Sequence, residues 1–185
     1  MKIAVIGPQN TGKSTFVKDF VNAFPEFKTP LETYRDVVKK NNLSINQRTG
    51  IESQRLIRDF IYEQTKASED GTVFDRCLID NYIYSLYGFG QGNVSSDFLR
   101  ESESMMQESV LEIDHFFFIP TSLAVPLVED TLRDTQVSYV DTINRMFIDT
   151  LFVLVRTHAI QVSTIGGTRG ERIIQAREAF SNSRH

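Results

Sequence analysis

Short apolar runs alternate along the chain with longer segments in which apolar residues recur at helical spacing. The run at residues 3–6 is apolar and β-branched, which is typical of a buried strand in a parallel sheet. Similar runs predict strands at 72–75, 115–120 and 160–165. Residues 29–31 are a weaker candidate for a further strand.

Between these runs, apolar residues recur every third or fourth position, as in helices with one buried face. The predicted helices include residues 16–24, 56–61, 78–86, 98–113, 140–154 and 173–180. Residues 88–93 and 121–135 have an irregular pattern. Strands that alternate with helices are typical of βαβ units. We therefore expect one domain over residues 1–185 with an α/β fold, a three-layer sandwich around a mainly parallel sheet.

One motif predicts a phosphate-binding loop. Residues 7–14, GPQNTGKS, match G-x-x-x-x-G-K-[S/T] in full, between a predicted strand and a predicted helix. Glycines let backbone N–H groups approach phosphate oxygens, and the following helix presents its N-terminus to them. Lys13 would contact the β- and γ-phosphates, Ser14 would ligate Mg²⁺, and Thr15 would contact the α-phosphate. We expect ATP and Mg²⁺ at a P-loop that comprises Gly7, Asn10, Thr11, Gly12, Lys13, Ser14 and Thr15.

Asp75 and Arg76 form a second candidate motif, at the end of the apolar run 72–75. A carboxylate at this place is suited to hold Mg²⁺ through water, together with Ser14. Arg76 would reach toward the phosphates or toward the phosphate acceptor. The alternative for Asp75 is that it caps the next helix.

With these motifs the chain resembles the nucleoside and nucleotide kinase branch of P-loop proteins. It is most similar to the compact family that includes ribosylnicotinamide kinase domains and small phage nucleotide kinases. Phage hydroxymethyluracil-DNA kinases resemble the same family. The residues that carry the resemblance are 7–15, Glu32 with Arg35, Asp75-Arg76 with the helix of Tyr82 and Tyr84, and the segment around Arg133.

The resemblance implies a kinase that transfers the γ-phosphate of ATP to a nucleoside or nucleotide. It implies that Glu32 is the base for the acceptor hydroxyl, although a glutamate favoured by the helix dipole would have the same position. Asp75 remains the alternative base. The resemblance also implies a lid at about residues 121–145, where Arg133 would stabilise the moving phosphate unless it is an ordinary surface arginine. The predicted catalytic residues are Lys13, Glu32, Asp75, Arg76 and Arg133.

Charge and composition limit the partners but do not identify the acceptor. Lys and Arg total 20 against 24 Asp and Glu, a net charge of −4, which disfavours a broad nucleic-acid-binding face. This balance favours a small acceptor over a hydroxymethylated base in DNA. Arg169, Arg172 and Arg177 nevertheless make the tail locally basic, so modified DNA stays an alternative.

Location, assembly and a second function class follow from weaker signals. The only cysteine, Cys77, fits a reducing compartment, and no apolar run is long enough to cross a membrane, so we expect a cytoplasmic protein without a membrane partner. A homodimer is an expectation from compact nucleotide kinases. The alternative to a kinase is a P-loop ATPase or switch without a small-molecule acceptor.

Overall fold

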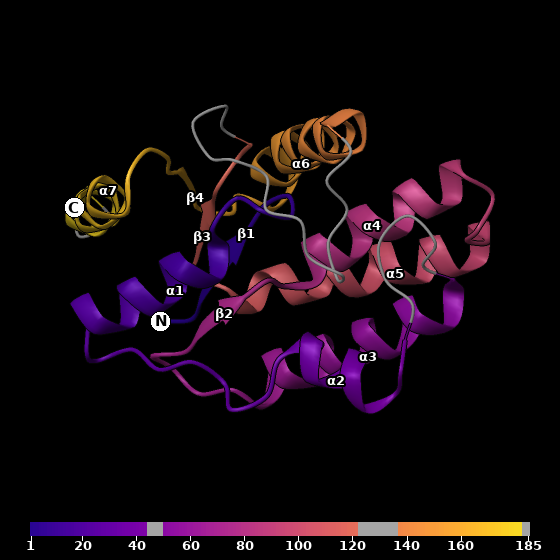
Figure 1. The fold of residues 1–185 in the computed structure, drawn as a ribbon, viewed down its shortest axis with the longest axis horizontal. Helices are drawn as coiled ribbons and strands as arrows, with labels where there is room; N and C mark the ends of the chain where they lie inside the picture. The colour runs from indigo at the N-terminus through magenta and orange to yellow at the C-terminus, as the bar shows by residue number, and fades with distance from the viewer. Residues whose placement is uncertain (44–49, 122–136, 183–185) are drawn as a thin grey trace.

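A computed structural model describes residues 1–43, 50–121 and 137–182 (Figure 1). In this part of the chain, four strands form one parallel sheet in the order β2-β1-β3-β4. The strands are β1 (Ile3–Ile6), β2 (Val73–Asp75), β3 (His115–Phe118) and β4 (Val162–Thr164). All four coincide with predicted strands, although β3 and β4 are shorter than their apolar runs.

The central position of β1 explains its sequence. Ile3 pairs with Val73 on one side and with His115 on the other, so β1 has a neighbour at both edges. Its four residues are completely buried because helices cover both faces of the sheet. A strand in this position is apolar on every residue, whereas a half-exposed strand would alternate.

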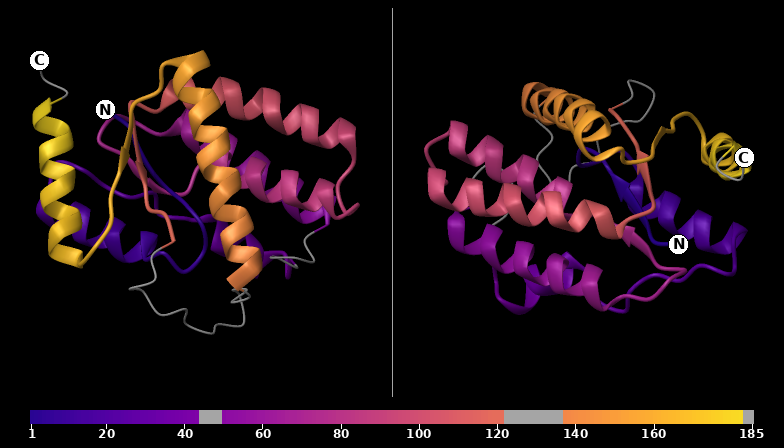
Figure 2. Two further views of the ribbon diagram at one scale, coloured as in Figure 1. Left: turned by 90° about the horizontal axis from the view of Figure 1, so that it is seen from above. Right: turned by 180° about the vertical axis from the view of Figure 1, so that it is seen from behind.

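Helices on the two faces make the three layers (Figure 2). On one face, Ile3, Val5 and Phe117 pack in a core with apolar residues of α1 (Lys13–Ala23) and α7 (Arg169–Asn182). On the other face, Ala4 and Phe116 pack with residues of α3 (Ile51–Ala67), α4 (Leu78–Gly90), α5 (Ser96–Ser109) and α6 (Val137–His158). The short α2 (Tyr34–Lys40) packs on α3, and a 3-10 turn, η2 (Val110–Glu112), follows α5. The predicted α/β three-layer sandwich is confirmed.

Two predictions about local structure are wrong. Residues 29–31 form no strand; the chain makes only an isolated parallel bridge between Lys28 and Thr72. Pro30 has no N–H to continue such a ladder. The segment expected to be irregular from residue 88 is helical up to Gly90. Gly88 is needed there for packing, since a β-carbon would lie 2.8 Å from Val94 Cγ2.

Some expectations concern residues that the structure does not describe. The proposed lid at about 121–145 falls mostly on residues 122–136, which lie outside the described residues, and its last part is the start of α6. None of the described helices has both the length and the apolar character required to cross a membrane.

Candidate active site

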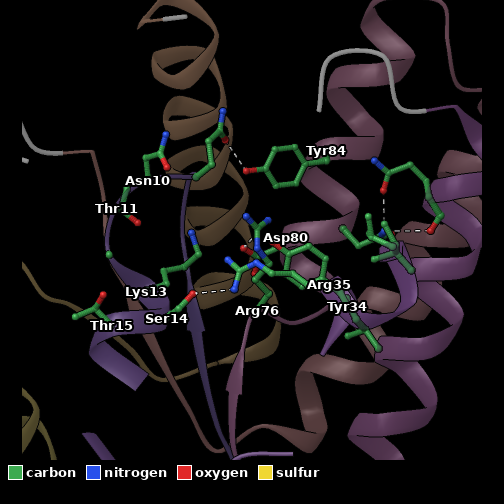
Figure 3. Close-up of a pocket in the computed structure, with 17 residues that line it drawn as sticks. Asn10, Thr11, Lys13, Ser14, Thr15, Tyr34, Arg35, Arg76, Asp80 and Tyr84 are labelled. Atoms are coloured by element: carbon green, nitrogen blue, oxygen red, sulfur yellow. Dashed lines mark hydrogen bonds and ion pairs between the residues drawn. The ribbon is translucent and has the colours of Figure 1, made fainter. Parts of the chain in front are cut away.

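The turn from β1 into α1 has the backbone of a phosphate-binding loop (Figure 3). Gly7, Asn10 and Gly12 have positive φ angles of 139°, 63° and 84°. A β-carbon at Gly7 would lie 2.3 Å from the carbonyl oxygen of Ile119, so this close approach requires glycine. Left-handed steps of this kind turn backbone N–H groups into an anion-binding nest. Because α1 begins directly after Gly12, the unpaired N–H groups of its first turn add to the nest.

Lys13 is a buried cation at the start of α1. Its ammonium group donates hydrogen bonds to the carbonyl oxygen of Gly7 at 2.7 Å and to that of Pro8. Burial is the main cause that lowers the pKa of Lys13 to about 7, and the positive charge of Arg76 is the second. A desolvated ammonium with this pKa is stabilised by an anion, and the phosphates of ATP fit this requirement.

Ser14 and Asp75 lie together beside Lys13. Asp75 ends β2 in register with Val5 of β1, and its Oδ2 accepts a 2.5 Å hydrogen bond from the Ser14 hydroxyl. The guanidinium of Arg35 lies 3.1 Å from Ser14 Oγ and 3.5 Å from Asp75 Oδ2. The other oxygen of Asp75 is buried and has no hydrogen-bond partner among the described residues. A hydroxyl beside a carboxylate with a free oxygen is a donor set that fits Mg²⁺.

Cys77 is the N-cap of the helix that follows β2, and its carboxylate partner is Asp80 and not Asp75. Asp80 Oδ2 accepts the backbone N–H of Cys77 at 3.2 Å in a capping box at the start of α4. The capping alternative for Asp75 is therefore wrong. Asp80 Oδ1 lies 3.8 Å from Arg76, and burial raises the pKa of the Asp80 carboxyl to about 6.

Arg76 is held between two aromatic rings (Figure 3). Its guanidinium carbon lies 4.8 Å from the ring centre of Tyr34 on α2 and 5.2 Å from that of Tyr84 on α4. The Tyr84 hydroxyl donates a 2.7 Å hydrogen bond to Gln9 in the phosphate-binding loop. Arg76 also has a positive φ of 88°, a strained conformation for a residue with a side chain. The contacts with the two rings hold the cation at the pocket and help to compensate for the backbone strain.

A pair of buried amides forms the wall opposite the phosphate-binding loop. Asn81 Nδ2 on α4 donates to Gln54 Oε1 on α3 at 2.8 Å and to the Gln54 carbonyl at 3.1 Å. Val38, Ile57 and Ile61 line the same wall with apolar surface. One pocket therefore joins the phosphate-binding loop to a partly apolar wall with amide groups.

Arg172 supports the phosphate-binding loop from behind. This residue of α7 is 7% exposed and donates a 2.8 Å hydrogen bond to the Thr11 carbonyl. Its Nε donates to the Gly167 carbonyl at 3.0 Å, so one side chain ties the loop after β4 to the phosphate-binding loop. From the sequence, Arg172 was only one of three arginines in a basic tail.

Comparison with known proteins identifies the family. A family model described as an AAA domain, AAA_28, matches residues 2–172. The chain belongs to the AAA_28 family. No curated protein sequence matches the chain significantly.

Solved structures of kinases share the fold of this AAA_28 domain. Deoxyadenosine kinase from M. mycoides, with the products dCMP and dCDP, has a TM-score of 0.73 at 17% identity, covering 99% of this chain and 100% of that chain. NadR protein in complex with NR has a TM-score of 0.69 at 16% identity, covering 98% of this chain and 50% of that chain. Thymidylate kinase from Candida albicans has a TM-score of 0.68 at 12% identity, covering 99% of this chain and 92% of that chain. The resemblance to P-loop nucleoside and nucleotide kinases is confirmed at the level of fold.

The AAA_28 domain brings most of the predicted site residues together. Asp75 lines a hollow adjoining the pocket, together with Glu32, whose side chain is exposed. Arg133 lies outside the described residues. The predicted residues that line the main pocket are Asn10, Thr11, Gly12, Lys13, Ser14, Thr15 and Arg76.

Several residues of the pocket region were not predicted from the sequence, among them Gln54, Asp80, Asn81 and the supporting Arg172. No short motif marks them. The sequence signal that could have found Gln54 is a polar residue on the apolar face of a helix. Gln54 lies three residues before Ile57 and seven before Ile61, so it shares their face of α3, and it is buried as they are. A buried polar side chain on such a face indicates a partner across a site.

Proposed function

We propose that the chain is an ATP- and Mg²⁺-dependent kinase that transfers the γ-phosphate to a nucleoside or nucleotide. The observation that supports this function best is the pocket that joins the phosphate-binding loop to a wall of amides, aromatic rings and apolar side chains. ATP hydrolysis alone needs a donor site and a water molecule. A second wall built next to the donor site supports the binding and orientation of an organic acceptor.

On the donor side, each residue has a distinct task. The backbone of the loop binds phosphate oxygens, and Lys13 places positive charge beside them. Ser14 and Asp75 would hold Mg²⁺, which when bound neutralises phosphate charge and orients the phosphates. Arg172 keeps the loop in place through the Thr11 carbonyl.

On the acceptor side, the wall suits a flat heterocycle with polar edges. Gln54 and Asn81 offer amide groups that can form hydrogen bonds with such an edge, while Ile57 and Val38 cover apolar surface. Arg76, fixed between its two rings, supplies positive charge between this wall and the phosphate-binding loop. This combination supports nucleosides and nucleotides as the class of acceptor.

Two carboxylates compete for the role of general base. Asp75 is already engaged by Ser14 and Arg35, which suits a metal-binding carboxylate. Glu32 lines the adjoining hollow with its side chain exposed, and Gln64 holds its backbone carbonyl at 2.8 Å. We therefore assign metal binding to Asp75 and proton abstraction from an acceptor hydroxyl to Glu32.

Transfer of labelled γ-phosphate from Mg-ATP to a panel of acceptors tests the function. The panel contains nucleosides, nucleoside monophosphates, ribosylnicotinamide, and DNA with and without hydroxymethylated bases. We expect label on a nucleoside or nucleotide, and its loss in Lys13→Ala. Release of free phosphate with every acceptor unlabelled would contradict a kinase and support an ATPase. Label on the hydroxymethylated DNA alone would replace the small acceptor by a base in DNA.

Glu32→Gln separates the two carboxylates. If Glu32 is the base, this variant slows transfer to a hydroxyl acceptor while Mg-ATP binding is unchanged. An equal rate in wild type and Glu32→Gln would overturn this assignment but leave the kinase function standing.

A further inference from the structure

Arg35 contacts both of the side chains to which the proposed function assigns metal binding. Its Nη1 donates a 3.1 Å hydrogen bond to Ser14 Oγ (Figure 3). The same nitrogen lies 3.5 Å from Asp75 Oδ2, the oxygen that also accepts the 2.5 Å hydrogen bond from Ser14. The three side chains therefore form one closed cluster, in which a single nitrogen of the guanidinium serves two oxygens.

The second oxygen of Asp75 does not remove this conflict. Asp75 Oδ1 is buried and has no hydrogen-bond partner among the described residues. It belongs to the same carboxylate, so a divalent cation bound through it would still lie close to the Arg35 guanidinium. Two positive charges at such short range repel each other, and more strongly in a partly buried place than in water. Arg35 must therefore leave the cluster before Ser14 and Asp75 can hold a metal ion.

In the absence of a metal, Arg35 stabilises the site. The Asp75 side chain is only 12% exposed, and a carboxylate at this depth is costly without a positive charge beside it. Arg35 supplies that charge, and it also donates to the Ser14 hydroxyl, which holds both side chains in place. The guanidinium thus does for the empty cluster what a metal ion would otherwise do.

The Arg35 side chain can leave while its helix stays in place. Thr33 and Asp36 form a capping box that fixes the backbone at the start of α2. The Arg35 side chain itself is 30% exposed and lines both the main pocket and the adjoining hollow. Rotation about the side-chain bonds is therefore enough to move the guanidinium away from Ser14 and Asp75.

We propose that Arg35 is a stand-in cation that competes with Mg²⁺ for Ser14 and Asp75. The proposal rests on the metal-binding role that the proposed function gives to these two residues. The competition lowers the affinity of the site for a free divalent cation. Bound phosphates add negative charge and further oxygen ligands, so they shift the balance toward the metal. The site would thus discriminate against free metal ions and accept a metal together with the phosphates of ATP.

Titration with Mn²⁺ in the absence of nucleotide tests the competition, with free Mn²⁺ measured by electron paramagnetic resonance. Arg35→Gln should bind Mn²⁺ about 10-fold more tightly than the wild type, because Ser14 and Asp75 no longer have to release an arginine. The matched control is Lys18→Gln, which removes the same charge from an exposed residue one turn after Ser14 that lines the same hollow as Arg35. A charge at this exposed place is screened, so Lys18→Gln should change the affinity by no more than about 2-fold.

Three results of this titration would overturn the proposal. Equal Mn²⁺ affinities of wild type and Arg35→Gln would show that the arginine does not compete. Equal gains in Arg35→Gln and Lys18→Gln would show a general effect of charge instead of a contact with the ligands. Arg35→Gln without any Mn²⁺ binding would show that removal of the arginine does not open a metal site.

Asp75→Asn shows where the ion binds. Added to Arg35→Gln, it should remove the whole gain in Mn²⁺ affinity, with a circular dichroism spectrum like that of the wild type. A double variant that binds Mn²⁺ as tightly as Arg35→Gln would place the ion elsewhere and overturn the proposal. The titration contains neither ATP nor an acceptor, so it is read separately from phosphoryl transfer. The expected Mn²⁺ affinities without any transfer would refute the kinase alone, whereas transfer with equal Mn²⁺ affinities would refute the role of Arg35 alone.

Discussion

The phosphate-binding loop and the wall opposite it are built in different ways. In the loop, contiguous residues supply backbone N–H groups and the two side chains Lys13 and Ser14. In the wall, single side chains from α2, α3 and α4 meet only because those helices pack together, as with Gln54 and Asn81. The loop is thus a local structure, whereas the wall depends on the tertiary fold.

This difference predicts two separable sets of variants. Changes in the loop should weaken the use of ATP with every acceptor, because ATP is the common substrate of the proposed reaction. Changes in the wall should weaken the use of the acceptor and leave ATP binding almost unchanged. Variants that affect only one substrate would show that the loop and the wall are separate subsites, whereas equal effects on both substrates would show that they act as one.

The largest effect is expected for Lys13→Ala. Loss of the only buried ammonium in the described part of the chain removes positive charge beside the phosphates, so kcat/KM for phosphoryl transfer should fall by at least about 100-fold. The matched control is Lys39→Ala, since Lys39 is exposed on α2. Equal activities of the two variants would show that the loop does not bind the donor.

Arg76→Lys should have the next largest effect. Lysine cannot keep a planar guanidinium between Tyr34 and Tyr84, so kcat/KM for the acceptor should fall about 10- to 100-fold. Arg100→Lys, a change on the exposed side of α5, should have no effect. The affinity for an ATP analogue, measured by calorimetry, should change little. If this affinity falls as much as kcat/KM for the acceptor, Arg76 belongs to the donor site.

Gln54→Leu should specifically raise the KM for the acceptor. In the proposed kinase this amide contacts the acceptor heterocycle, so its loss is expected to raise the KM for the acceptor about 10-fold, with the KM for ATP unchanged. Gln107→Leu, an exposed position on α5, serves as the matched control. If the KM for ATP rises as much as that for the acceptor, the amide wall does not define a separate subsite.

The smallest effect is an uptake of protons when ATP binds. Because the pKa of Lys13 is lowered to about 7, this group is mostly neutral at pH 8 in the absence of phosphate. Bound phosphates raise the pKa, so ATP binding at pH 8 should take up most of one proton. Calorimetry in two buffers of different ionisation enthalpy measures this uptake. Equal binding enthalpies in both buffers would contradict a lowered pKa for Lys13.

The sequence predicts the parts of the site that depend on short stretches of chain. Lys13 and Ser14 belong to one contiguous motif, and Asp75 follows an apolar strand that pairs with β1, so the meeting of Ser14 and Asp75 could be expected. The strand predicted at residues 29–31 is wrong because Pro30 lacks the N–H that a strand ladder requires. The sequence pattern thus predicts a structure correctly where a short stretch of backbone forms it and no proline interrupts the hydrogen bonds.

The remaining residues depend on contacts that no local pattern encodes. Gln54 and Asn81 meet through the packing of α3 on α4. Asp80 follows Asp75 closely, but only the capping geometry of α4 separates their roles. Arg172 reaches the loop because α7 returns to α1 on the same face of the sheet. Such residues become visible only when the helices are placed.

The most direct test of the kinase function is the dependence of ADP formation on the acceptor. Wild-type protein with Mg-ATP is assayed with and without the nucleoside or nucleotide that accepts label, and ADP, free phosphate and phosphorylated acceptor are quantified together. A kinase predicts that the acceptor accelerates ADP formation and that each ADP is matched by one phosphorylated acceptor. ADP formed at the same rate without any acceptor, and matched by free phosphate, would contradict the kinase function.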